Sequence, residues 1–133
     1  MESASFDSQK MYRKSVALQD LSEAIAAYFS SNKDTFTLRR YSSFRDDVSK
    51  SLVTDASLIT KQIRLASSSN SYSARMKSLA FINVMTQNIL AYCNGLEKDG
   101  VKEKEYLNLL RKEIRSFRVS FKKWRKSFQN GMD

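Results

Sequence analysis

The stretch YLNLLRKEIRSFRVSFKKWRKSF, residues 106–128, decides the fold of this chain. Apolar residues recur along it at alternating steps of three and four, which is typical of an amphipathic helix that packs against other helices along one seam. They are Leu107, Leu110, Ile114, Phe117, Phe121, Trp124 and Phe128. The pattern predicts a long helix over about residues 102–129 whose apolar side closes a helical bundle.

Three earlier segments show the same kind of spacing. We expect helices over about residues 8–29, 34–66 and 74–96, with a loop docked on the core as the alternative for residues 34–40. Short links separate them: SSNKD at 30–34, a serine-rich segment at 67–73 and GLEKDG at 95–100. Such residues favour turns. The sequence therefore predicts an all-α fold, an antiparallel up-down-up-down four-helix bundle. It would form one domain over residues 8–130, after a flexible N-terminal tail at 1–7.

The third predicted helix carries polar residues on its apolar face. Asn83 and Thr86 interrupt the seam, and buried polar groups there need hydrogen-bond partners. We favour a shifted face that uses Ile82 and Met85, with a role in register or assembly as the alternative. The single cysteine, Cys93, has apolar neighbours and is expected to be a small buried hydrophobe, not a reactive thiol.

Composition excludes most catalytic chemistry. The chain has 133 residues, no histidine, no proline and three glycines. Without histidine it lacks the commonest general base and metal ligand. It also lacks a glycine-rich phosphate loop, a CxxC pair and any metal-ligand spacing of its carboxylates. We expect no enzyme activity, no cofactor and no metal.

No apolar run approaches the roughly 20 residues of a membrane span, and no signal peptide is apparent. We expect a cytoplasmic protein that does not bind membranes.

Charge points to the class of partner. The net charge is +9, and residues 71–133 hold thirteen bases against six acids, whereas residues 1–70 hold ten against eight. In the decisive stretch a basic stripe runs beside the apolar seam, with Glu113 as its one acid. Ordinary solvated helix faces mix both signs. The residues that we predict to bind nucleic acid are Arg111, Lys112, Arg115, Arg118, Lys122, Lys123, Arg125 and Lys126.

Other interpretations of this helix stay open. The stripe could meet an acidic protein, or it could simply keep the chain in solution. The aromatic residues among the bases could stack on nucleic-acid bases, although their heptad spacing favours the core. Trp124 and Phe128, near the end of the bundle, are the candidates for exposure. A basic amphipathic helix could also lie on an anionic membrane, but the bundle needs the same apolar seam.

Several short motifs give a resemblance to a known family. They are Arg39, Arg40 and Tyr41 at the entry to the second helix, Ala66 and Asn70 at its end, Arg75 and Leu79 in the third, the charged turn before Tyr106, and Trp124, Arg125 and Lys126. Across residues 34–128 the chain resembles the four-helix-bundle family of the accessory variability determinant of diversity-generating retroelements. The proteins encoded in intervening sequences of bacterial ribosomal RNA are related to it. The latter typically have a proline at the entry to the second helix, which this chain lacks, so we favour the retroelement branch.

The resemblance implies a non-enzymatic accessory subunit. Retroelement members of this family form a pentamer, bind nucleic acid and associate with a reverse transcriptase during error-prone copying of a template RNA. By this resemblance the partners would be the reverse transcriptase, RNA and an RNA–DNA duplex, with the chain as a homo-oligomer. The alternatives are a structural adaptor for an acidic protein and a ribosomal-RNA intervening-sequence four-helix protein.

Overall fold

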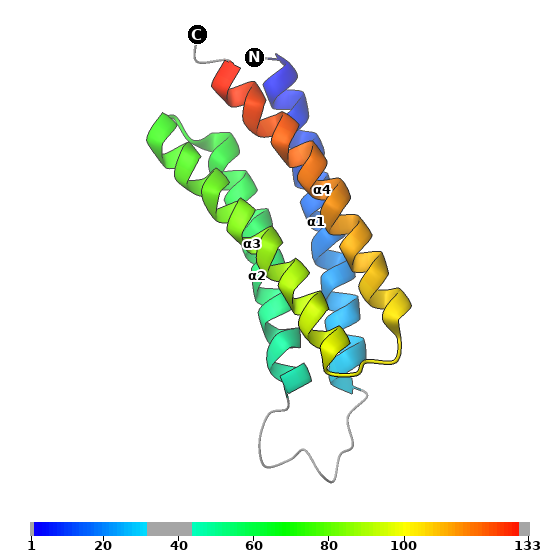
Figure 1. Cartoon of the computed structure of the whole chain (residues 1–133). Coiled ribbons are helices and arrows are strands. Elements are labelled where there is room, and N and C mark those ends of the chain that lie inside the picture. The colour runs from blue at the N-terminus through cyan, green and yellow to red at the C-terminus, as the bar shows by residue number, and fades with distance from the viewer. Residues whose placement is uncertain (1, 32–43, 131–133) are drawn as a thin grey trace.

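The chain folds as four long antiparallel helices. The computed structural model describes residues 2–31 and 44–130, which form α1 (Glu2–Ser31), α2 (Phe44–Ser68), α3 (Tyr72–Lys98) and α4 (Lys104–Asn130). Each helix packs against the next in the chain, and α4 returns to pack against α1 (Figure 1). The predicted all-α up-down bundle is thus confirmed. The start of α1, the end of α4 and the α2–α3 turn lie at the same end of the bundle, the upper end in Figure 1.

The start of the first helix differs from the sequence prediction. Helix α1 begins at Glu2 and includes residues 2–7, which we expected as a tail before a start near Ser8. Ser8 is docked on α4, where it accepts a hydrogen bond from Trp124. A docked helix extends at little cost because propagation is easier than nucleation. The predicted start of the second helix near residue 34, and the motif Arg39 to Tyr41, lie outside the described residues.

The turn between α2 and α3 is shorter than the serine-rich segment suggested. Ser67 and Ser68 remain in α2, and their hydroxyls donate to the Ile63 and Arg64 carbonyls at 2.8 and 3.0 Å. These bonds to the preceding turn let serine stay helical. Ser71 then caps α3 by accepting from the Ala74 amide at 3.2 Å. Only residues 69–71 therefore connect the two helices.

The two glycines of the predicted GLEKDG stop have different roles. Gly95 lies inside α3, where the ring of Phe44 packs over it. Gly100 has a φ of 90°, a left-handed conformation that suits glycine at the end of a helix. Between them Asp99 accepts from Arg45 at 2.8 Å and ties this link to the start of α2. The helix therefore ends at Lys98, and Gly100 is the residue that turns the chain.

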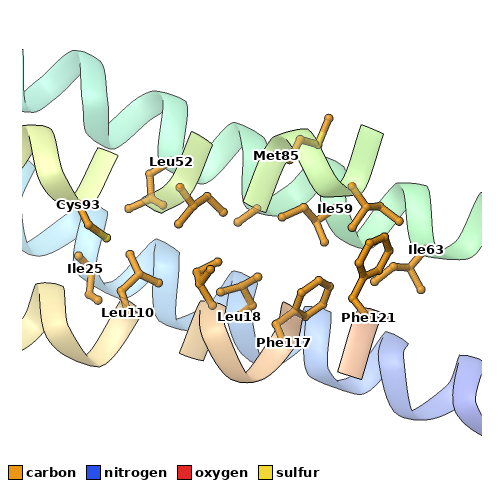
Figure 2. Close-up of a cluster of buried hydrophobic side chains, with 14 of the residues drawn as sticks. Leu18, Ile25, Leu52, Ile59, Ile63, Met85, Cys93, Leu110, Phe117 and Phe121 are labelled. Atoms are coloured by element: carbon orange, nitrogen blue, oxygen red, sulfur yellow. The ribbon is translucent and has the colours of Figure 1, made fainter. Parts of the chain in front are cut away.

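The predicted α4 seam is the core of the bundle. All seven of its apolar residues are buried and meet side chains from the other three helices (Figure 2). Trp124 is only 1% exposed, and its indole N–H donates to the Ser8 hydroxyl at 2.9 Å. Phe128 packs against the Trp124 ring, with the centroids 5.1 Å apart. The core positions favoured by the heptad spacing are thus confirmed for Trp124 and Phe128 also, the two candidates for exposure, because α1 covers this end.

The shifted face of α3 is confirmed. Ile82, Met85 and Thr86 are buried, whereas Ala80 is exposed. The Thr86 hydroxyl donates to the Asn83 carbonyl at 2.8 Å and accepts from Arg118 at 2.7 Å. The buried polar group that the sequence placed on this seam therefore has two partners.

Serines occupy core positions of α1 that the apolar pattern did not reveal. Ser15 and Ser22, seven residues apart, are fully buried between the core residues Met11, Leu18 and Ile25. Ser15 donates to the Tyr12 carbonyl at 2.6 Å. Small side chains at these positions let a neighbouring backbone approach closely, a need that hydrophobicity alone does not signal.

Cys93 is a buried small hydrophobe, as predicted. Burial raises the pKa of its thiol from 9.0 to about 11, although Arg111 and Arg115 nearby oppose the shift. The pKa lies above the unfolded value, so the thiol does not affect stability below about pH 9. Above that pH the unfolded chain ionises first, and stability falls as pH rises toward 11.

We predict that Cys93 is inert toward a disulfide reagent at pH 8. The covered, protonated thiol can react only when the chain opens, so labelling of the folded chain should be at least about 100-fold slower than labelling in denaturant. Absorbance of the released thiolate measures both rates, with Cys93→Ala as the blank. Fast labelling of the folded chain would show that the thiol is accessible.

We also predict opposite effects of alanine at the two glycines. A Cβ at Gly95 would lie 3.2 Å from the Phe44 ring, which is half exposed and free to shift. Gly95→Ala should therefore stabilise the chain by up to about 1 kcal/mol through helix propensity. Gly100→Ala should cost about 1–2 kcal/mol, because alanine is strained at that φ. Urea unfolding followed by circular dichroism measures both. Equal losses at the two sites would mean that the Phe44 ring cannot move.

Candidate polyanion-binding surface

The geometry of α4 divides the eight predicted binding residues into two groups. Arg111, Arg118 and Arg125 are seven residues apart, follow the apolar seam on the side of α3 and are partly buried. The other five are exposed: Lys112, Arg115, Lys122, Lys123 and Lys126. The basic stripe is therefore an inner row of arginines and an outer row available to a partner.

Arg111 is engaged within the chain. Its guanidinium lies 2.6 Å from a Glu97 carboxylate oxygen and donates to the side-chain oxygens of Asn94 and Asn108, both at 2.9 Å. Arg111 therefore joins α4 to the end of α3, and Glu97 neutralises its charge. This is a structural role that the charge pattern of α4 alone did not indicate.

The other two inner arginines have no carboxylate partner among the described residues. Arg118 donates to the buried Thr86 hydroxyl at 2.7 Å, which fixes one end of its guanidinium. The Arg125 guanidinium lies 5.8 Å from the centre of the Phe121 ring, within cation–π range. Both side chains are held in place while their positive charges remain uncompensated, so they add to the field of the outer row.

The fold gathers further bases at the same end of the bundle. In α1, α2 and α3 these are Lys10, Arg13, Lys14, Lys61, Arg64, Arg75 and Lys77. Together with the six bases of α4 after Ile114, thirteen Lys and Arg fall within residues 8–18, 56–68, 72–86 and 115–130, and these ranges contain no Asp or Glu. We call these four ranges the acid-free half.

Contacts between helices show that the four ranges lie together. The Lys14 ammonium donates to the Ser116 hydroxyl at 3.3 Å, which joins α1 to α4. The Arg64 guanidinium lies 5.9 Å from the Tyr12 ring centre, which joins α2 to α1. Arg75 stacks on Phe128 at 4.4 Å, which joins α3 to α4. All four ranges therefore meet at the upper end of Figure 1.

Arg75 does more than carry charge. Its guanidinium also donates to the carbonyls of Ala66 and Ser69, at 3.1 and 2.6 Å, and so closes the α2–α3 turn. The side chain thus holds the turn against the aromatic end of α4. Arg75, like Arg111, therefore has a structural role in the bundle in addition to its positive charge.

The other half of the bundle has the opposite balance. Residues 19–31, 44–55 and 87–114 contain seven bases and ten acids. Like charges gathered at one end of a molecule produce a directed field that attracts polyanions and raises their rate of association. The charge is thus separated along the bundle, a feature that the basic α4 stripe showed only in part.

A metal-binding cluster and a membrane span are both absent from the described residues. Within residues 2–31 and 44–130, no cluster of three or more Cys, Asp or Glu residues could hold a metal ion. None of the four described helices is both long and apolar enough to cross a membrane. The rings of Phe117, Phe121, Trp124 and Phe128 are buried and so cannot stack on nucleic-acid bases in this fold. What this surface offers to a ligand is positive charge.

Comparison with protein-family models, with curated proteins and with solved structures found no match to this chain.

The sequence held a signal for the bases that we missed. No Asp or Glu occurs from Ala56 to Leu96, or from Ile114 to Asn130. These acid-free runs are visible without a structure, yet only the antiparallel fold places them side by side with the first half of α1. A search for missing acids, in addition to clustered bases, would have found the surface.

We predict that charge reversal lowers the stability of the chain more at the inner row than at the outer row. Arg118→Glu removes the donor to buried Thr86 and places a carboxylate in a half-buried position, so it should destabilise the chain by about 1–3 kcal/mol. Lys122→Glu makes the same charge change at an exposed position and should cost no more than about 0.5 kcal/mol. Urea unfolding compares the two variants. Equal stabilities would contradict the anchored position of Arg118.

Proposed function

We propose that this chain binds nucleic acid by its phosphate backbone, through the acid-free half of the bundle. The observation that supports this most strongly is the gathering of thirteen bases from all four helices at one end, where Glu2 and Asp7 in the first turns of α1 are the acids among the described residues. Backbone phosphates favour such a surface because each contact releases condensed counterions and each arginine can donate two parallel hydrogen bonds.

The outer row on α4 and the neighbouring bases of α1 would form the contact surface. Lys122, Lys123 and Lys126 are exposed, as are Lys10 and Arg13 across the α1–α4 interface. These are flexible or forked cations on rigid helices, which suits phosphate positioning and not base readout. With the four aromatic rings of the α4 seam buried, binding through the outer row should depend little on base sequence.

A more specific proposal about the biological role rests on the sequence resemblance. We propose an accessory subunit of a diversity-generating retroelement reverse transcriptase, which holds template RNA or an RNA–DNA duplex and assembles as a homo-oligomer. A ribosomal-RNA intervening-sequence protein is the alternative within the same family. A bundle of four helices and a basic surface agree with both. Among the residues that carry the resemblance, however, Arg75, Leu79 and Trp124 hold the bundle together. They support a common fold more than a common function.

We predict salt-dependent binding of a duplex RNA that requires the outer row. If about six phosphates are contacted, affinity should fall about 10³-fold between 50 and 200 mM salt. The triple variant Lys122→Glu, Lys123→Glu, Lys126→Glu should bind at least about tenfold more weakly at the lower salt, with a salt slope reduced by about 2–3. Fluorescence anisotropy with a labelled 20-base-pair RNA measures both quantities.

A matched control reverses three exposed lysines of the other half. Lys50→Glu, Lys98→Glu and Lys104→Glu make the same change in net charge at exposed positions. This variant should bind RNA more strongly than the outer-row variant, because its changes lie far from the acid-free half. Equal losses in the two variants would show that only net charge matters. Absence of RNA binding by the unmodified chain would end the proposal.

A further inference from the structure

The acid-free half has a second surface, which is apolar. The surface proposed for nucleic acid is basic. Nine large apolar side chains are exposed among the described residues. Three of them gather on the outer face of α2 and α3: Leu65 at 46%, Phe81 at 53% and Val84 at 52% exposure. Leu58, which is partly buried, completes what we call the α2–α3 strip.

Contacts across this face fix how the two helices align. The Phe44 ring of α2 packs over Gly95 of α3. Further along, the carboxylate of Asp55 accepts from Asn88 at 3.3 Å and from Tyr92 at 2.7 Å. Burial, followed by this bond to Asp55, raises the pKa of Tyr92 to about 12. These contacts show that α2 and α3 run antiparallel with Phe44 and Gly95 on one shared outer face.

Helical periodicity extends the same face to the strip. Leu58 and Leu65 follow Phe44 by fourteen and twenty-one residues, and Phe81 precedes Gly95 by fourteen. Residues seven apart repeat on nearly the same side of a helix. The antiparallel alignment therefore places Phe81 across from the interval between Leu58 and Leu65, with Val84 one turn further along α3.

The charges beside the strip define the class of partner. Exposed lysines flank it, Lys61 on α2 and Lys77 on α3, and no acid occurs from residue 56 to residue 96. The nearest carboxylate, that of Asp55, is occupied by Tyr92 and Asn88. A second copy related by a two-fold axis would bring these lysines against one another. Nucleic acid would leave the apolar side chains in water.

We infer that the α2–α3 strip is a docking site for an acidic amphipathic helix of another protein. Apolar side chains of such a helix, three and four residues apart, would cover Leu65, Phe81 and Val84, and its flanking carboxylates would meet Lys61 and Lys77. The strip lies on α2 and α3, whereas the outer row lies on α4. The site thus differs from the α1–α4 contact surface proposed for nucleic acid, although Lys61 and Lys77 are among the thirteen bases of the acid-free half.

A designed peptide tests the inference with the full-length chain. The probe is a fluorescent 21-residue helix with Leu at heptad positions a and d and Glu at e and g. Matched peptides carry Lys in place of Glu, or Ser in place of Leu. We expect anisotropy to detect binding of the Leu/Glu peptide alone. Its Kd should rise at least about tenfold in Phe81→Ser, Val84→Ser and should change little in the control Leu109→Ser, Val119→Ser, which alters exposed apolar residues of α4.

Further measurements test the remaining explanations of peptide binding. Circular dichroism checks that each variant folds, and Lys61→Glu, Lys77→Glu, which leaves the apolar residues in place, should also weaken peptide binding. RNA affinity of the Phe81, Val84 variant should be unchanged, which separates this site from the proposed function. The inference is overturned if the Leu/Glu peptide does not bind, if it binds the Phe81, Val84 variant equally well, or if the Lys peptide binds as tightly. It is also overturned if that variant lowers the molar mass in light scattering, because a second copy would then cover the strip.

Discussion

Burial of one apolar residue every three or four positions along α4 is the constraint on which the rest of the structure depends. With Leu107 to Phe128 committed to the core, the rotation of the helix determines where each neighbouring base must lie. Positions next to the seam receive Arg111 and Arg118, which contact α3, and Arg125, which lies over the Phe121 ring. Positions farther round receive the exposed cations. The same hydrophobic pattern that closes the bundle therefore sorts its charges into structural and available ones.

The antiparallel order of the helices determines a second feature of the structure, the separation of charge along the bundle. Each helix has an acid-free part, and in an up-down bundle residues 8–18 of α1 and the first part of α3 lie beside the last part of α2 and α4, with Glu2 and Asp7 of α1 at the tip of this end. If any one helix ran in the opposite direction, its bases would mix with the acids of the other half. The field of the molecule is therefore a property of the topology as much as of the composition. Its cost is repulsion between like charges, which a bound polyanion would relieve.

The sequence predicted what depends on periodicity. The α4 seam, the shifted α3 face with Ile82 and Met85, and the burial of Cys93 follow from local spacing, and the structure confirms them. What depends on contacts between helices was not predictable in this way. The ion pair of Arg111 with Glu97, the burial of Trp124 against Ser8 and the closure of the α2–α3 turn by Arg75 all require knowledge of which helix lies opposite. The place of the α1 bases beside the α4 stripe was missed for the same reason.

Two faces of the acid-free half differ in the chemistry of their exposed side chains. The α1–α4 side presents lysines and arginines on a rigid support, whereas the α2–α3 side presents Leu65, Phe81 and Val84 between two lysines. A protein that held nucleic acid on one side and a protein helix on the other would act by bringing the two together. It would need no catalytic group of its own.

The central claim is that the acid-free half is the part of the chain that meets a polyanion. Backbone amide chemical shifts of the isotopically labelled chain, followed while duplex RNA is added at low salt, test it most directly. The account predicts changes concentrated in residues 8–18 and 115–130, with smaller ones near the α2–α3 turn and almost none around Glu97, Asp99 and Glu103. Changes centred on that acidic end, or spread evenly over all four helices, would contradict it.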